Sequence, residues 1–382
     1  MLTVLDYIQQ YNYSFEEKKI NEIDLLILSQ FSMLKFVKVL DNTNTNEKHF
    51  SLQDLLNIVT SVTSTNDYNY IKDLYKAELF DELVPKNQDP TNLELLKLLC
   101  ASKRFRELQI KYHVDRFEVE KEKQFSATCF IYKKKFSIIA FRGTDTTFVG
   151  WKEDFNLSYQ KEIPAQTEAV QYINTISRLL PKNIYVCGHS KGGNLALYAA
   201  MFCKKDIKDD IVKICSFDGP GFSSRVSNSE EYKSIINKSV KIVPENSIIG
   251  LVLKTLEPIK VIHSNEFWIM EHNIYSWEIT EQMKLKYVDD ISDSAKRTKL
   301  SINEFYESLT LEKKKEFINQ AYEILISTGA TDFTELNDDL GKYLPMIMNK
   351  ITKIDKSKRS LLIDTFTSLG KYHLKNIVKK VN

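Results

Sequence analysis

The sequence lacks an excess of charge of either sign, because 53 Lys and Arg residues stand against 51 Asp and Glu residues, a net charge of +2. Nothing general in this balance favours nucleic acid as a partner. Long apolar runs are also missing, and none approaches the roughly 18 residues that cross a bilayer. We therefore expect no transmembrane segment, although peripheral contact with a membrane stays open. Residues 1–6 lack a basic stretch and a long apolar stretch, so no signal peptide is expected.

Cysteine is scarce and shows no pattern. The cysteines are odd in number, and their spacing fits neither a disulfide framework nor a metal site. They stand in apolar surroundings, at Cys100, Cys129, Cys187, Cys203 and Cys215. This arrangement predicts buried, reduced thiols in a cytoplasmic protein. We expect no metal ion and no organic cofactor.

Apolar periodicity divides the 382 residues into three regions. Residues 1–106 are predicted to be a mainly helical N-terminal region packed on the core, with one of its helices at 51–59. Residues 107–285 change to a period of two and are predicted to be the core. Residues 286–382 return to helical patterns, the last of them at 361–378.

The core region alternates predicted strands and helices. Strands are predicted at 125–132 and 135–141, a helix at 166–180, and further strands at 184–187 and 211–217. This order is typical of an α/β protein. It implies a mostly parallel central sheet flanked by helices on both faces.

One stretch of this core has a catalytic pattern. The apolar strand 184–187 leads into residues 188–192, Gly-His-Ser-Lys-Gly, which match G-x-S-x-G and precede a helical pattern. A strand, a tight turn and a helix of this kind expose a serine hydroxyl at the carboxyl edge of the sheet. The glycines remove side chains that would collide with the neighbouring strand and helix. An ordinary glycine-containing turn is the alternative, which the flanking strand and helix make weaker.

Lys191 follows this serine, Ser190. Its backbone N–H would point at the oxyanion that forms when the hydroxyl attacks a carbonyl carbon. Its side chain has two interpretations. Either the ammonium lines the pocket and favours an anionic substrate, or it is simply solvated.

Two more motifs resemble those of the class 3 lipases, an α/β-hydrolase family. They are residues 141–144, Phe-Arg-Gly-Thr, and residues 151–154, Trp-Lys-Glu-Asp. The resemblance implies an α/β-hydrolase-like fold, to which the helical patterns before and after the core add helical N- and C-terminal extensions. It also implies that Thr144 contributes to an oxyanion hole and that Asp154 holds Thr144 in place. A simpler interpretation, in which Asp154 caps a helix and Trp151 fills the core, is compatible with these roles. Class 3 lipases usually carry an apolar residue where this chain has a lysine after the serine.

The sequence resembles an Mbeg-like family of bacterial proteins more closely. Four spaced motifs of that family are matched by residues 188–196, 217–222, 243–250 and 272–277. The resemblance extends over roughly residues 1–290, and the four spaced motifs make it specific. It implies an α/β-hydrolase-like fold and a serine nucleophile, but it brings no substrate.

A nucleophilic serine needs a histidine to take its proton. In this fold the histidine follows the nucleophile in the chain, which leaves His263 and His272 once the histidine of the helical tail is set aside. His263 stands in a strand-like stretch and is interpreted as a core or surface residue. His272 follows an apolar segment where a strand is expected to end, and it matches the family pattern, so we prefer it as the base.

The acid that orients the histidine has two candidates. Asp218 ends the strand after the elbow helix, and Glu245 follows the next strand. Class 3 lipases carry their aspartate in a D-x-V-P context, but here residues 241–244 read Lys-Ile-Val-Pro, so that aspartate is absent. We choose Asp218, with Glu245 as the alternative or as a supporting residue. A structural role for Asp218 in the turn 219–221 is the simpler interpretation.

These residues predict a serine hydrolase that cleaves an ester-like bond. Ser190, His272 and Asp218 would form the triad, and an acyl-enzyme would be the intermediate. The expected substrate is a small-molecule acyl ester or a lipid. The alternative is a catalytically silent α/β-hydrolase scaffold that acts as a binding or regulatory module.

The apolar residues 247–253 have two interpretations. A strand or helix of the core comes first. The alternative is that they line an acyl pocket, with Leu251 or Leu253 bordering a cavity that opens onto Ser190.

Overall fold

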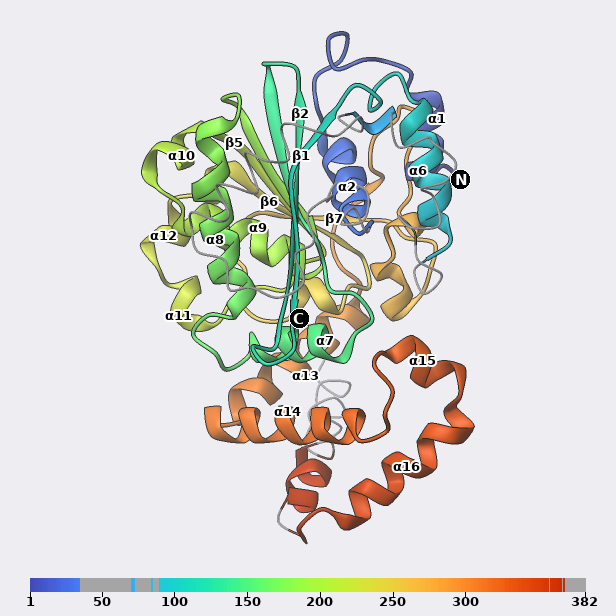
Figure 1. Cartoon of the computed structure of the whole chain (residues 1–382), viewed down its shortest axis with the longest axis vertical. Helices are drawn as coiled ribbons and strands as arrows, with labels where there is room; N and C mark the ends of the chain where they lie inside the picture. The colour runs from blue at the N-terminus through green and yellow to red at the C-terminus, as the bar shows by residue number, and fades with distance from the viewer. Residues whose placement is uncertain (35–69, 73–83, 85–88, 357, 366, 368–382) are drawn as a thin grey trace.

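The computed structural model describes residues 1–34, 70–72, 84, 89–356, 358–365 and 367, which Figure 1 draws in colour. The helix predicted at 51–59 lies outside these ranges, as does most of the helix predicted at 361–378.

An eight-stranded sheet forms the centre of the described structure, and its strands lie side by side in the order of the sequence. They are β1 (Gln109–Glu118), β2 (Lys123–Tyr132), β3 (Phe136–Phe141), β4 (Ile184–His189), β5 (Ile211–Phe217), β6 (Ser239–Pro244), β7 (Ile259–Ile262) and β8 (Tyr287–Val288). The first three strands form an antiparallel meander. Strands β3 to β7 run parallel, and β8 pairs antiparallel with β7. The predicted mostly parallel sheet is confirmed.

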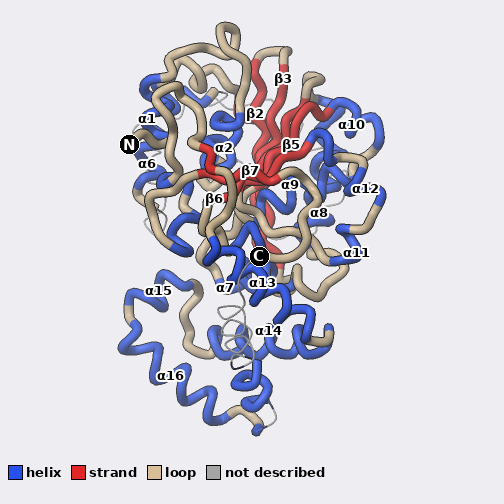
Figure 2. Tube along the Cα trace, turned by 180° about the vertical axis from the view of Figure 1, so that it is seen from behind, coloured by secondary structure: helices blue, strands red, loops and turns tan. Residues whose placement is uncertain are grey.

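The sequential strand order decides where the covering helices lie. Right-handed connections that all step in the same direction leave their helices on one face of the sheet. Helices α8 (Pro164–Ile176) and α9 (Lys191–Phe202) lie together on that face (Figure 1). The other face is covered by the N-terminal region, through α1 (Val4–Gln10), α2 (Glu22–Phe31) and α6 (Thr91–Ala101), which Figure 2 shows from behind.

Alternate residues of the central strands face two different cores. In β4, Val186 packs in the core under α9, whereas Cys187 faces the core under the N-terminal helices. In β5, Ile214 and Cys215 divide in the same way, and all four residues are fully buried. Strands buried on both faces read as continuous apolar runs in the sequence. The chain therefore has an α/β-hydrolase-like fold with helices on both faces of the sheet, as predicted.

Helix α2 is held in place by a buried ion pair. Asn21 caps its first turn by accepting the N–H groups of the second and third helical residues. Asp24 in that turn receives two hydrogen bonds from Arg104, Nε to Oδ1 at 2.6 Å and Nη2 to Oδ2 at 2.6 Å. The remaining guanidinium N–H groups donate to backbone carbonyls of the segment before α2, which include those of Lys18 and Lys19. The pair therefore joins α2 to the segment that follows α6.

The C-terminal region adds α13 (Asp293–Ser308), α14 (Leu311–Ile326), α15 (Phe333–Asp338) and α16 (Leu340–Lys353), drawn at the bottom of Figure 1. It meets the core at α7 (Phe148–Asn156). A β-bridge joins Thr147 to Asp332, and the rings of Phe148 and Phe333 lie 4.9 Å apart edge to face. The division of the chain at residues 106 and 285 stays a prediction.

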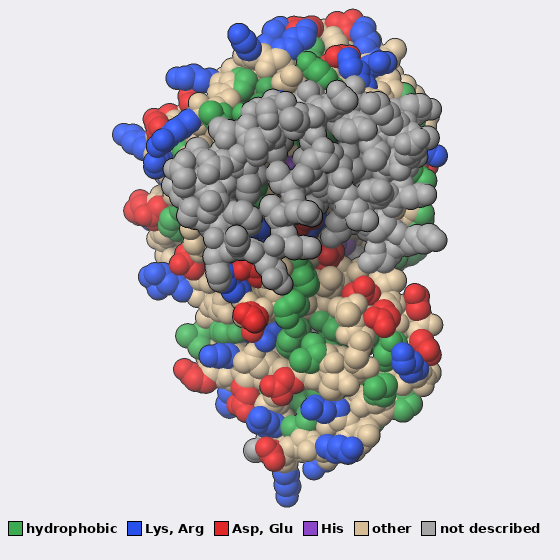
Figure 3. All heavy atoms as spheres, in the orientation of Figure 1, with side chains coloured by type: hydrophobic (Ala, Val, Ile, Leu, Met, Phe, Trp, Pro, Cys, Tyr) green, Lys and Arg blue, Asp and Glu red, His purple; other side chains and the backbone are tan. Residues whose placement is uncertain are grey.

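The surface and the thiols agree with the composition. Basic and acidic side chains alternate over the coloured part of the face drawn in Figure 3. All five cysteines are buried and free of disulfides. Burial raises the pKa of the Cys187 thiol to about 12. Among the described residues, no helix combines the length and the apolar character needed to cross a membrane.

The Arg104–Asp24 pair provides a first test of this architecture. Arg104→Met would leave Asp24 buried without a partner charge, so the free energy of unfolding should fall by about 3–5 kcal/mol. Lys103→Met is the control, because Lys103 pairs with Glu17 at the surface, where such pairs contribute about 0–1 kcal/mol. Urea unfolding of both variants measures the difference. Equal losses in the two variants would contradict the importance of the buried pair.

Candidate active site

The turn between β4 and α9 puts Ser190 in a strained backbone conformation. Ser190 has φ 57° and ψ −132°, a region that side-chain-bearing residues rarely adopt. A Cβ at Gly188 would lie 2.2 Å from the carbonyl carbon of Gly192, and a Cβ at Gly192 would lie 2.1 Å from the backbone oxygen of Phe141. Only glycine permits this approach of strand and helix. The strand, turn and helix expected from G-x-S-x-G are therefore present.

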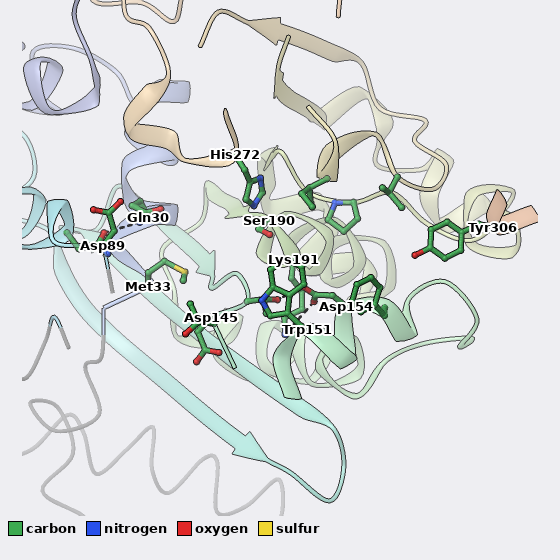
Figure 4. Close-up of a pocket in the computed structure, with 17 residues that line it drawn as sticks. Gln30, Met33, Asp89, Asp145, Trp151, Asp154, Ser190, Lys191, His272 and Tyr306 are labelled. Carbon is green, nitrogen blue, oxygen red and sulfur yellow. Dashed lines mark hydrogen bonds and ion pairs between the residues drawn. The ribbon is translucent and has the colours of Figure 1, made fainter. Parts of the chain in front are cut away.

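His272 and Asp218 lie next to this turn. His272 ends the short 3-10 helix η6 (Trp268–His272), and its Nδ1 donates to Oδ2 of Asp218 at 2.7 Å. The other carboxylate oxygen of Asp218 accepts from the Ser247 hydroxyl at 2.5 Å and from the Gly250 N–H at 3.1 Å. Figure 4 shows the His272 ring directed toward Ser190, and both residues border one cavity.

The environment of Asp218 favours its charged form. Burial acts to raise the pKa of this carboxyl, but the hydrogen bond and charge of His272 outweigh it, with help from Ser247, and hold the pKa below its usual range. The side chain is 1% exposed. A buried carboxylate with a fixed imidazole partner can orient the ring and offset its positive charge.

Glu245, the alternative candidate for the acid, pairs with His263 and not with His272. Glu245 Oε1 accepts from Nδ1 of His263 at 2.5 Å, and Nε2 of His263 lies 3.5 Å from a Glu278 carboxylate oxygen. Both residues of this pair are partly exposed. The structure thus pairs each candidate acid with a different histidine, Asp218 with His272 and Glu245 with His263.

His189 holds the backbone of His272. Its Nε2 donates to the His272 carbonyl oxygen at 2.9 Å, and the two rings lie 4.4 Å apart. Burial, and then the charge of His272, lower the pKa of His189 to about 3, so its ring stays neutral. Trp277 Nε1 donates to the carbonyl oxygen of Glu271 at 2.8 Å. These two hydrogen bonds fix consecutive carbonyls of η6, a role that the sequence did not reveal for Trp277.

Thr144 follows β3 and faces the turn at Ser190. Its hydroxyl donates to Oδ2 of Asp154 at 2.6 Å, the contact that the resemblance to class 3 lipases implied. Burial raises the pKa of Asp154 to about 6, and the nearby Lys191 opposes this effect. Asp154 does not cap α7, because Thr147 accepts the capping hydrogen bond from Gly150 at 3.2 Å.

The Lys191 side chain follows neither expectation. It is 1% exposed, so it is not solvated. Its ammonium donates to Oε2 of Glu153 at 2.9 Å and to the backbone oxygen of Gln124 at 3.0 Å. An ammonium paired in this way is not free to bind an anionic substrate. Nothing in the sequence indicated Glu153 and Gln124 as the partners of Lys191, although Glu153 lies within the Trp-Lys-Glu-Asp motif.

A cavity of about 430 Å³ opens onto Ser190. Segments from all three regions of the chain line it. Figure 4 shows Gln30 and Asp89 on one side of Ser190 and Tyr306 on the other. Among the described residues, the apolar lining consists of Met33, Trp151, Phe155, Pro220, Ile249 and Val252, and the polar lining includes Gln30, Asp89, Asn92, Asp145 and Tyr306. The expectation for the apolar segment 247–253 needs a correction, because Ile249 and Val252 line the cavity and Leu251 and Leu253 do not. Among the described residues, no group of three His, Cys, Asp or Glu side chains is arranged to hold a metal ion.

Comparison with known families identifies the chain. The model of the Mbeg1-like family matches residues 99–323. The chain belongs to the Mbeg1-like family. This Mbeg1-like match covers the sheet, the serine turn and helices α13 and most of α14, and it confirms the resemblance found in the motifs.

Two solved structures resemble the Mbeg1-like chain distantly. M37 lipase is 18% identical with a TM-score of 0.30, over 53% of this chain and 70% of the lipase. A triacylglycerol lipase, described as having a serine protease triad as its catalytic centre, is 14% identical with a TM-score of 0.32, over 57% of this chain and 83% of that one. No curated protein sequence matches the chain.

The neutral ring of His189 predicts a specific acid sensitivity. Its folded pKa of about 3 lies below the ordinary 6.5. Between these pH values His189 is protonated in the unfolded chain but not in the folded chain. The free energy of unfolding therefore falls as the pH drops below about 6.5. From pH 7 to pH 5 the wild type should lose about 2 kcal/mol more unfolding free energy than His189→Gln.

Urea unfolding at several pH values measures this difference. From pH 8 to pH 7 both proteins should change equally, which serves as the internal control. Parallel curves over the whole range would refute a buried neutral His189.

Proposed function

We propose that this Mbeg1-like protein is a serine hydrolase that cleaves an ester-like bond through an acyl-enzyme. The observation that supports this most strongly is the convergence on one cavity of a serine on a strained turn and a histidine bonded to a buried carboxylate. A histidine within reach of a serine and oriented by a third group is the arrangement that activates a hydroxyl nucleophile.

In the proposed reaction, the Ser190 hydroxyl oxygen attacks the acyl carbon of the ester while His272 Nε2 takes the hydroxyl proton. Asp218 keeps the Nδ1 proton in place and offsets the positive charge of the ring. The backbone N–H groups of Thr144 and Lys191 stabilise the oxyanion. His272 then gives its proton to the departing alcohol oxygen, and the C–O bond breaks.

The second half of the reaction releases the acid. A water molecule gives a proton to His272 and its oxygen attacks the acyl carbon bound to Ser190. Collapse of the second tetrahedral intermediate returns the proton to Ser190. The cycle needs no group beyond this chain, the ester and water.

The cavity supports a small acyl ester or a lipid as the substrate. Its volume lies within the range of about 300–1,000 Å³ that is usual for small-molecule sites. Ile249 and Val252 provide an apolar wall for an acyl chain, and Gln30 and Asn92 provide a polar wall for the alcohol part. Five buried free thiols support a reducing compartment such as the cytoplasm.

Covalent labelling tests the proposal directly. A fluorophosphonate should modify Ser190 in the wild type, and peptide mass spectrometry should locate the label. Ser190→Ala and His272→Ala should both abolish labelling, because the nucleophile and its base act as one unit. Urea-unfolded wild type serves as the control for unspecific reaction. An unlabelled folded wild type would favour a silent scaffold that acts as a binding or regulatory module.

A matched pair of substitutions tests the acid. Asp218→Asn should lower kcat on a short ester by roughly 10⁴-fold, because the imidazole loses its carboxylate partner. Glu245→Gln should leave kcat within about threefold of the wild type, since Glu245 binds the other histidine. Steady-state kinetics on p-nitrophenyl butyrate measures both. A reversed order of effects would assign the acid to Glu245.

A further inference from the structure

A buried ion pair lies directly behind the serine turn. Lys191, the residue after Ser190, is 1% exposed, and Glu153 on α7 is fully buried. Oε2 of Glu153 accepts from the Lys191 ammonium at 2.9 Å. We propose that Glu153 and Lys191 are positioning residues that hold the oxyanion-binding backbone of the serine turn in place. This inference rests on the proposed function and deepens it, because it concerns the geometry of the same reaction.

Glu153 is a rigid anchor. Besides the ammonium, its Oε2 accepts the Gln124 N–H of β2 at 3.0 Å, and its Oε1 accepts the Ala165 N–H at the start of α8 at 2.9 Å. The carboxylate therefore joins α7, β2 and α8, and it cannot move without the loss of several hydrogen bonds. A lysine side chain tied to such a point restrains its own backbone.

The same network reaches the second proposed oxyanion donor. The side-chain oxygen of Gln124 accepts the Asp145 N–H at 3.2 Å, directly after Thr144. The Lys191 ammonium also lies 3.8 Å from Oδ1 of Asp154, whose other oxygen holds the Thr144 hydroxyl. The loops that carry the two N–H donors are thus both hydrogen-bonded to one group of neighbouring side chains, those of Gln124, Glu153 and Asp154.

Gly150 leaves the space that the Gln124 side chain occupies. A Cβ at Gly150 would lie 2.5 Å from the side-chain oxygen of Gln124 and 2.8 Å from Cγ2 of Thr144. The absence of a side chain there lets Gln124 reach the loop after β3.

The pair also controls the charge behind the oxyanion. Figure 4 shows Lys191 and Asp154 close together beside Ser190. The ammonium lies between two carboxylates, Glu153 and Asp154. Without it, the carboxylate of Glu153 would oppose the negative charge that develops on the substrate. Lys191 therefore contributes to oxyanion stabilisation in two ways. Its backbone N–H is held in position, and its ammonium offsets the negative charge of Glu153.

If the pair served stability alone, a folded variant without the pair should keep its activity. Replacing both members of a buried ion pair by apolar residues of similar volume is often neutral for stability. The double variant Lys191→Met with Glu153→Leu therefore leaves neither charge of the pair without its partner. It also removes the acceptor of the Gln124 and Ala165 N–H groups, so its Tm should fall by about 5–15 °C. If the pair positions the turn, activity should fall although the variant remains folded.

The experiment compares this double variant with the wild type on p-nitrophenyl butyrate. We expect kcat to fall roughly 10- to 100-fold while KM changes less than about threefold, as for an interaction made in the transition state. Affinity for butylboronic acid, which forms a tetrahedral adduct with a serine, should fall by the same factor as kcat. The matched control is Lys123→Met with Glu168→Leu, a buried pair that also joins β2 to α8. It should leave kcat unchanged.

The outcomes separate the inference from the proposed function. Full kcat in the folded double variant, or a rise in KM alone, would overturn the positioning role and leave the hydrolase in place. A wild type that neither hydrolyses esters nor reacts with a fluorophosphonate would overturn the proposed function and this inference with it. Glu153→Gln, which keeps the shape of the side chain, provides the second variant if the double variant does not fold. It should lower kcat by roughly 10-fold with KM unchanged, and an unaltered kcat would overturn the inference.

Discussion

The close approach of α9 to β4 is the constraint on which the rest of the site depends. Because Gly188, Gly192 and the end of β3 touch without any room for a Cβ, the turn between them is forced into a positive φ at Ser190. Such strain costs on the order of 1–3 kcal/mol and persists only where the surroundings over-determine it. Here β4 and α9, in which every residue except Tyr185 and Phe202 is buried, provide those surroundings. The contact of Gly192 with Phe141 also holds the loop after β3 beside the serine turn.

The order of the strands has a consequence that reaches the cavity. A sheet whose parallel connections all step one way receives its own helices on one face, so the other face needs cover from the N-terminal region. Helix α2 supplies that cover, and its end brings Gln30 and Met33 to the cavity. From the C-terminal region, α13 brings Tyr306 to the same cavity. Part of the cavity wall therefore comes from two segments without catalytic motifs, beside a centre that is rich in them.

Burial sets the charge states around this centre. Asp218 remains ionised because His272 and Ser247 outweigh its desolvation, whereas His189 remains neutral because nothing comparable offsets its burial. Glu153 and Lys191 neutralise each other behind the turn. Asp218 and His189 are thus held in the forms that the proposed reaction uses, Asp218 by partners from distant parts of the chain and His189 by burial.

The sequence alone determined the features that depend on local geometry. Glycines around Ser190 permit only one kind of turn, and continuous apolar runs indicate strands buried on both faces, so the elbow and the parallel sheet could be predicted. Only the tertiary structure decided the partner of Lys191, because Glu153 lies 38 residues away and meets it through strand register and helix packing. The same holds for Ile249 and Val252, which line the cavity in place of their leucine neighbours. Hydrophobicity predicts that such a segment is buried, but the side of the segment that faces the cavity depends on the packing of the whole chain.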